Sequence, residues 1–208
     1  MTHTSPNVTI HTAGLGDLDT IVDTLATGFH DGDFADWLIP EPATRAAVYP
    51  GYFRILAEHA LSTGWVELAG DGEAVAVWHT LGSAPIAAVP IPRYQHRLAD
   101  AVGPEALPRF QALDAALEEH HPAGAHHYLA FLAVRPRLRG NGLGSALLEC
   151  HHRYLDKHAI PAYLEATGLR NQQLYLRHGY QPHPPYLLAE DSPQALPMWR
   201  PPRPGAAG

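Results

Sequence analysis

The sequence predicts an α/β fold in which helices flank a single mixed β-sheet, and three observations carry that prediction. Tyr128 to Val134 is a continuous apolar run, which is typical of a strand buried on both faces at the centre of a sheet. A helical pattern and a second short strand, Tyr163 to Ala166, follow it, so a right-handed crossover should make the two strands parallel. Trp65 to Ala69 and Ala74 to His79 flank a Gly-Asp-Gly turn and predict an antiparallel hairpin.

The other segments supply helices and the ends of the sheet. Asp17 can cap a helix whose apolar residues recur at helical spacing as far as Phe29, and a second helix should run from about Thr44 to Ser62, with a possible break near Pro50. Glycine and prolines predict a loop over residues 30–42. The remaining elements are expected in this order: a strand at Val8 to His11, a proline-bearing stretch at Pro85 to Pro92, helices at Arg93 to Val102, Glu105 to His121 and Leu143 to Tyr154, a short helix at Asn171 to His178, and strands near Tyr186 to Leu188 and Leu196 to Trp199.

Composition and length limit the class of protein. The chain has 208 residues, 46% of them hydrophobic, which fits one domain over residues 1–208 with a helical insertion at about 80–125 and a proline-rich tail from about residue 200. The longest apolar run is far shorter than the roughly 20 residues of a membrane span, and the first residues do not resemble a secretory signal. One cysteine, Cys150, favours a reducing, cytoplasmic setting.

Charge is distributed unevenly along the chain. The net charge is −7, from 14 basic and 21 acidic residues, so we expect neither nucleic acid nor a membrane surface as a partner. Seven acidic residues precede the first basic residue, Arg45, and the arginines crowd the segment 135–177. The acidic excess therefore lies entirely in the first 44 residues.

A glycine-rich loop follows the predicted central strand and opens a helix. Its backbone N–H groups and the helix dipole converge on one point, which suits a phosphate. The loop lies five residues beyond the strand and has Ser145 at its last position, unlike a dinucleotide fingerprint, and no Lys-Ser or Lys-Thr pair of a P-loop follows it. The pattern Arg-x-x-Gly-x-Gly at Arg139, Gly142 and Gly144 resembles the acyl-CoA pyrophosphate motif of GNAT N-acetyltransferases.

A second motif extends that resemblance. Residues 164–167, Asn171 and the segment Tyr175 to Tyr180 are similar to the second GNAT motif, a strand and an asparagine followed by a tyrosine before a glycine and an aromatic residue. Residues 72–78 and 131–146 are most similar to the puromycin-acetyltransferase-like small-molecule branch of the family. The resemblance implies the GNAT fold, in which the central strand splays from its parallel neighbour.

Further expectations follow from the resemblance. Acetyl-CoA, or another acyl-CoA, would be the cofactor: backbone groups of Leu132 to Val134 would bind its pantetheine arm, and Asn171 would reach that arm. The amides of the glycine loop would hold its pyrophosphate, aided by three nearby arginines. The expected cofactor-binding residues are Leu132, Ala133, Val134, Arg139, Gly140, Asn141, Gly142, Leu143, Gly144, Ser145, Asn171 and Tyr175.

Catalysis by this family needs a neutral amine, a donor to the thioester oxygen and an acid for the departing thiolate. The resemblance makes Tyr175 the acid. Glu165, at the end of the second parallel strand, is the first candidate for the base, with an ion pair to Arg170 or Arg177 as the alternative. His127 is the second candidate, because its ordinary pKa is near neutrality.

The remaining candidates concern metals and the acceptor. Histidine pairs at 120–121, 126–127 and 151–152 lack the spacing of a metal motif, so we expect no metal. The acidic stretch from residue 31 to 41 should attract a cationic amine, and aromatic residues should add an apolar wall. The predicted acceptor-binding residues are Asp31, Asp33, Trp37, Trp78 and Tyr94.

These features predict an N-acyltransferase, a monomer or homodimer that acylates the primary amine of a small molecule by direct attack in a ternary complex. Antibiotic resistance or biosynthesis is the expected role. Two alternatives stay open from the sequence: a non-catalytic acyl-CoA sensor or scaffold, and a protein or peptide N-acetyltransferase.

Overall fold

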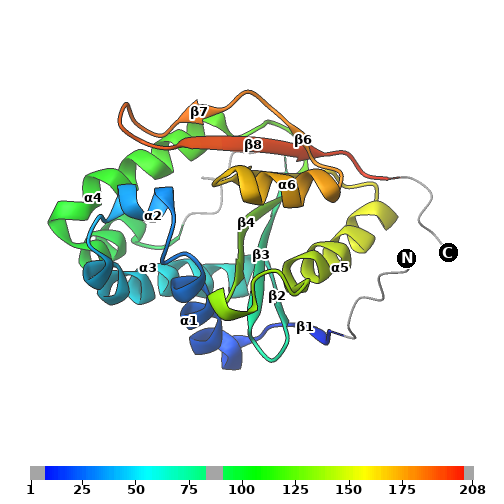
Figure 1. Ribbon diagram of the computed structural model, residues 1–208, viewed down its shortest axis with the longest axis horizontal. Helices are drawn as coiled ribbons and strands as arrows, with labels where there is room; N and C mark the ends of the chain where they lie inside the picture. Colours follow the sequence, from blue (N-terminus) through cyan, green and yellow to red (C-terminus); the bar gives the residue numbers. More distant parts are fainter. Residues whose placement is uncertain (1–7, 83–90, 204–208) are drawn as a thin grey trace.

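A computed structural model describes residues 8–82 and 91–203, and it contains the predicted mixed sheet with helices on both faces (Figure 1). The strand order is β1-β2-β3-β4-β5-β8-β6, with β7 paired to β8. The strands are β1 (Ile10–Thr12), β2 (Trp65–Ala69), β3 (Ala74–Leu81), β4 (His126–Val134), β5 (Ala162–Ala166), β6 (Gln181–Pro182), β7 (Tyr186–Leu187) and β8 (Gln194–Arg200). The helices are α1 (Leu18–Gly28), α2 (Asp33–Leu38), α3 (Pro42–Thr63), α4 (Tyr94–His120), α5 (Leu143–Lys157) and α6 (Leu169–Arg177), with short 3-10 turns at Leu15–Asp17 and Pro136–Leu138.

The two faces of the sheet carry separate hydrophobic cores. Helices α1 to α4 pack on one face around a cluster that includes Ile21, Phe53 and Phe110. Helices α5 and α6 pack on the other face around Leu147 and Leu148. Figure 1 shows the first group of helices, coloured blue to green, on the opposite side of the central strands from α5. The layered arrangement follows from the apolar stripe of each helix.

The parallel pair diverges, as the family resemblance implied. Strands β4 and β5 are paired at two positions, His127 with Ala162 and Tyr128 with Tyr163. Strand β4 continues six residues beyond Tyr128, and β5 continues three residues beyond Tyr163. The backbone groups of β4 that would face β5 along this length therefore lack a strand partner.

A β-bulge in β4 lies where the divergence begins. Val77 of β3 pairs with Phe131, whereas the next residue, Trp78, pairs with Leu129, so Ala130 is the extra residue. Before the bulge, Tyr128 and Ala130 face the side of α3 and α4, and after it Phe131 faces the same side. The bulge thus places two consecutive side chains on one face of the sheet.

Two local predictions need comment. Residues 30–42 are not simply a loop, because Asp33–Leu38 form helix α2, in which Ala35, Trp37 and Leu38 are buried and override the loop signals. The two helices predicted around residue 104 are confirmed, since Gly103, with φ of +74°, separates them inside α4.

The segment predicted from Pro85 lies largely outside the described residues, and the end of the proline-rich tail does so as well. Within residues 8–82 and 91–203, no helix is long and apolar enough to cross a membrane.

Candidate active site

A cavity of about 160 Å³ lies beside the divergence of β4 and β5. Its walls come from the end of α1, from α2, α3 and α4, and from the two diverging strands. The lining residues used below are Phe29, Asp31, Asp33, Ala130, Phe131, Glu165 and Thr167. The bulge supplies one wall, because Ala130 and Phe131 both face this side.

Glu165 is the carboxyl group of this cavity whose pKa the surrounding structure shifts. The hydroxyl of Tyr186 donates to its Oε1 at 3.4 Å, and the hydroxyls of Tyr128 and Tyr163 lie close enough to the carboxyl group to affect its pKa. Burial raises the pKa of Glu165 to about 7, although the nearby hydroxyls of Tyr128, Tyr163 and Tyr186 oppose that rise. A carboxyl group with this pKa exchanges protons near neutral pH.

The alternative role of Glu165 is wrong. Among the described residues, neither Arg170 nor Arg177 forms an ion pair with it, and both arginines lie on α6 with exposed or partly exposed side chains. Tyrosine hydroxyls surround the carboxyl group instead. The environment is therefore that of a buried acid with neutral hydrogen-bond donors.

His127 does not line this cavity, which weighs against its predicted role as the base. Its ring faces α5 and shares a hydrogen bond of 2.9 Å with the ring of His151, and its Nε2 lies 3.2 Å from the Thr80 hydroxyl. The side chain is 2% exposed, and burial followed by the neighbouring His151 lowers its pKa to about 4. Such a histidine is neutral and enclosed, and it serves the packing of the α5 face.

Tyr175 lies in the core between α6 and the sheet. It is 8% exposed, and its ring packs edge-on against Tyr180 at 5.7 Å. Burial raises its pKa, which keeps the hydroxyl protonated at neutral pH. Its hydroxyl has no hydrogen-bond partner within the described chain, so a proton on it remains available as a donor.

The glycine loop has the predicted geometry of an anion site. Gly142 adopts a φ of +85° as the N-cap of α5, so the amides of Leu143, Gly144 and Ser145 are the first of the helix and have no acceptor within it. A Cβ at Gly140 or Gly142 would meet no atom within 4 Å. The space in front of these amides is open, which fits the pyrophosphate of an acyl-CoA.

The arginines near this loop are engaged elsewhere, contrary to expectation. Arg135 pairs with Asp23 at 2.6 Å and with Glu73, and Arg137 also pairs with Glu73. Arg139 donates to the carbonyl oxygens of Gly28, at 2.6 Å, and Val134. These bonds tie the loop to α1 and to the β2–β3 turn, so backbone amides rather than arginine charge define the anion site.

Two further predicted cofactor-binding residues, Asn171 and Ser145, have partners within the protein. Asn171 does not cap α6, which begins at Leu169 after Gly168, and it donates instead to the Thr167 hydroxyl at 3.1 Å. Ser145 lies 3.1 Å from Nε2 of His178. Asn171 is exposed in the first turn of α6, shortly after the end of β5.

The predicted acceptor residues do not all line one cavity. Asp31 and Asp33 line the cavity that contains Glu165. Trp78 is fully buried, stacks on His151 at 4.1 Å and lies on the α5 face, so its predicted contact with the acceptor is not supported. Trp37 does not line this cavity. Its Nε1 donates a hydrogen bond to Asp191, and the Arg109 guanidinium lies over its ring at 5.8 Å. The second contact joins α2 to α4.

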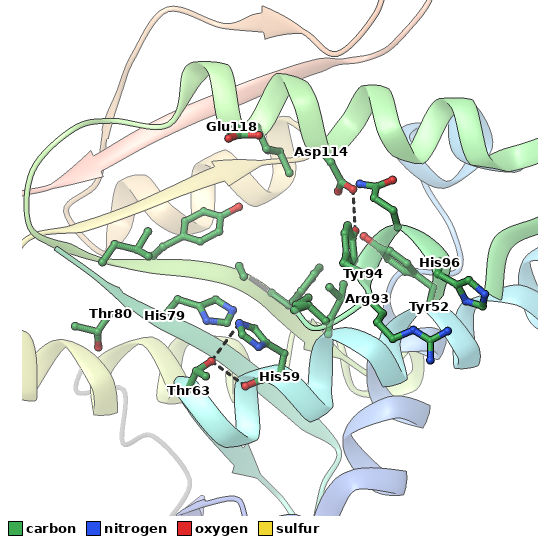
Figure 2. A pocket seen from close by; sticks show the side chains of 18 residues that line it. Tyr52, His59, Thr63, His79, Thr80, Arg93, Tyr94, His96, Asp114 and Glu118 are labelled. Atoms are coloured by element: carbon green, nitrogen blue, oxygen red, sulfur yellow. Dashed lines mark hydrogen bonds between the residues drawn. The ribbon is translucent and has the colours of Figure 1, made fainter. Parts of the chain in front are cut away.

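Tyr94 lines a second, larger cavity of about 600 Å³ between α3, α4 and the β3–β4 pair. Tyr52, Leu117, Tyr128, Ala130 and Phe131 belong to the walls of both cavities. Sequence reasoning missed this compartment, and it also missed Asp114, whose carboxylate accepts a 2.8 Å hydrogen bond from Tyr94 (Figure 2). An acidic residue in a long amphipathic helix carries no sequence signal that it lines a cavity.

The geometry defines an acyltransferase of the GNAT fold: a splayed parallel pair, a bulged central strand and an amide-lined loop at a helix N-terminus. Comparison with known proteins agrees. A family model described as an acetyltransferase (GNAT) domain matches residues 111–182. A solved structure of a histone acetyltransferase HPA2 and related acetyltransferase from Corynebacterium glutamicum is 28% identical, with a TM-score of 0.69 over 96% of this chain and 99% of that chain.

More distant structures show the same fold. Arylalkylamine N-acetyltransferase 2 from Aedes aegypti is 15% identical, with a TM-score of 0.61 over 94% of this chain and 99% of that one. The ribosomal-protein-S18-alanine N-acetyltransferase from Escherichia coli is 17% identical, with a TM-score of 0.55 over 97% and 98%. These comparisons identify a GNAT acetyltransferase domain within residues 111–182 and support N-acetyltransferase activity for a chain that has the GNAT fold throughout.

Proposed function

We propose that this enzyme transfers the acetyl group of acetyl-CoA to the primary amine of a small molecule by direct attack in a ternary complex. The observation that carries the proposal is the Glu165 carboxyl group, which faces a small acidic cavity beside the diverging strands. Asp31 and Asp33, which line the same cavity, favour a cationic acceptor. The Aedes aegypti enzyme is named as an arylalkylamine N-acetyltransferase, and that name agrees with a small amine as the acceptor.

The residues present fit an acyl-CoA. The edge of β4 after the bulge, including Leu132, Ala133 and Val134, has no strand partner in β5 and offers backbone groups to the pantetheine amides, and Asn171 in the first turn of α6 offers a side-chain amide. The amides of Gly140 to Ser145 offer donors to the pyrophosphate. When bound, the acyl-CoA supplies the activated acyl thioester.

Each chemical requirement then has a residue of this chain. Glu165 accepts the proton of the ammonium group, so that the nitrogen lone pair is free. Backbone N–H groups of β4 beside the bulge donate to the thioester oxygen as negative charge develops on it. Tyr175 donates its proton to the departing thiolate. A raised pKa keeps Tyr175 protonated until that step, whereas its burial requires the thiolate to approach α6.

Release of coenzyme A, detected with a thiol reagent, tests the proposal. Wild type and Tyr175→Phe would be mixed with acetyl-CoA and a panel of aminonucleosides, aminoglycosides, amino acids, simple alkylamines and peptides. We expect release that depends on a small amine and falls in the variant. Coenzyme A binding without release across the panel would contradict the proposal and favour the sensor alternative.

A protein or peptide acceptor is the second candidate, because the Escherichia coli structure is named as a ribosomal-protein-S18-alanine N-acetyltransferase. Peptides that compete with small amines for one site would favour it. The predicted roles in resistance or biosynthesis depend on which amine the panel identifies.

A further inference from the structure

The larger cavity has a composition that the transfer reaction itself does not require. Its walls are mostly apolar, with Leu56, Leu81 and Leu117 among them. Two carboxylates, Asp114 and Glu118, lie one helical turn apart on α4 and line the same cavity. Figure 2 shows them on the wall opposite His59 and His79.

The acidic wall has no cationic partner within the described part of the chain. Of the basic residues beside it, Arg97 pairs with Glu58 and His96 with Asp100, and no ion pair reaches Asp114 or Glu118. Arg93 also lines the cavity, but Figure 2 shows its guanidinium directed away from Asp114. An uncompensated carboxylate in an apolar cavity is costly, and a cationic ligand would offset that cost.

A buried hydroxyl points to the same ligand. Tyr52 is 7% exposed and lines both cavities, and its hydroxyl forms no hydrogen bond with any described residue. In Figure 2 that hydroxyl is directed toward the Tyr94–Asp114 pair. It therefore offers an acceptor oxygen to an N–H donor that reaches Asp114.

The opposite wall does not repel a cation. The rings of His59 and His79 stack at 5.9 Å. Burial lowers the pKa of His59. Burial, together with the charge that His59 can carry, lowers the pKa of His79 to about 4. Both rings are therefore neutral at pH 7. Burial also raises the pKa of Asp114 to about 6, which still leaves its carboxylate mostly ionised above pH 7.

The two compartments share one wall. Tyr128, Ala130 and Phe131 line both of them, and Glu165 faces the smaller one. We propose that the larger cavity binds the non-reacting end of the acceptor, an apolar chain with a second cationic nitrogen that is held by Asp114 and Glu118. The inference rests on the proposed function, because it assigns the acceptor class as a diamine whose reacting nitrogen lies at Glu165.

Binding and turnover of two chain-matched amines test this inference. The probes are 1,8-diaminooctane and octylamine, titrated calorimetrically into the protein with coenzyme A, and assayed with acetyl-CoA. In wild type, the diamine should bind at least 10-fold more tightly than octylamine. In Asp114→Asn and Glu118→Gln that preference should fall at least 3-fold in each, while affinity for octylamine is unchanged.

Glu119→Gln is the matched control, since Glu119 is next to Glu118 on α4, is exposed and does not line the cavity. It should keep the wild-type preference. Glu118 is itself exposed, so its variant tests the inference even if Asp114→Asn folds poorly. Equal affinity for both probes in wild type, or an unchanged preference in both cavity variants, would overturn the inference.

The two proposals fail separately. Octylamine acetylation without a diamine preference would leave the proposed function intact and contradict the acceptor class. A diamine preference that depends on Asp114 and Glu118, without any acetyl transfer, would support the cavity assignment and contradict the proposed function.

Discussion

The two faces of the sheet both bury titratable side chains, yet one face exposes them to a cavity and the other does not. On the α5 face, His127 and His151 share a hydrogen bond, and both are less than 3% exposed. On the opposite face, Glu165 accepts a hydrogen bond from Tyr186, has the hydroxyls of Tyr128 and Tyr163 nearby, and still lines a cavity. Burial favours the neutral form of both kinds of group, so access rather than burial separates a candidate base from a packed side chain.

The bulge in β4 explains how one strand serves both environments. His127 and Leu129 face α5, and after the extra residue Leu132 and Val134 face that side again. Ala130 and Phe131 are left together on the cavity side. The pleat of a regular strand would have turned one of them toward α5.

Replacement of Glu165 should have the largest effect. Glu165→Gln removes the proton acceptor and keeps the size of the side chain, so kcat/KM for an amine at pH 7.5 should fall at least about 100-fold. Coenzyme A affinity should be unchanged. A variant that keeps activity within about 3-fold would show that water or another group accepts the proton.

The same variant should be more stable than wild type at high pH. A pKa raised from 4.5 to about 7 means that the folded state binds the proton more tightly, so the stability that this proton confers is lost as pH rises from 4.5 through 7. Above pH 8, Glu165→Gln should gain about 3 kcal/mol in unfolding free energy. Urea titrations at pH 8.5 and pH 4.5 measure this. An equal difference at both pH values would argue against a raised pKa.

His127 should affect stability but not chemistry. His127→Asn leaves His151 without its partner in the core, and we expect a loss of about 1–2 kcal/mol in unfolding free energy. The value of kcat/KM should stay within about 3-fold of wild type at a temperature where the variant is folded. A 100-fold loss in a folded variant would make the α5 face part of the active site.

Arg137 should give the smallest effect. Its side chain is 66% exposed and pairs with Glu73 at the surface. Arg137→Ala should change KM for acetyl-CoA less than 3-fold and stability by less than about 0.5 kcal/mol. A KM increase of 10-fold or more would restore the sequence-based expectation that arginine charge neutralises the pyrophosphate.

The sequence predicted much of the framework because it depends on local patterns. The apolar run before Val134, the Gly-Asp-Gly turn and the glycines at 140–144 each encode their own conformation, and the order of elements follows from them. Asp33–Leu38 was missed, because burial of Ala35 and Leu38 outweighs the surrounding loop residues.

The site was less accessible to sequence reasoning, since it depends on which side chains share a cavity. Glu165 could be proposed from its place at the end of a strand, but its tyrosine partners come from β4, β5 and β7. Trp78 and Asp114 show that sequence reasoning can both assign a residue to a cavity wrongly and miss one that lines a cavity. The aromatic residue that looked suited to a binding wall is in the core, and the acid inside a helical pattern lines the larger cavity.

The pH dependence of kcat/KM tests most directly the claim that the Glu165 carboxyl group acts as the base. The acceptor should be an amine with a pKa above about 10, so that it stays an ammonium ion from pH 6 to 9 and its own titration does not contribute. The account predicts that kcat/KM rises with pH and levels off through an inflection near pH 7, and that Glu165→Gln abolishes the inflection. A flat profile from pH 6 to 9, or an inflection that persists in Glu165→Gln, would contradict it.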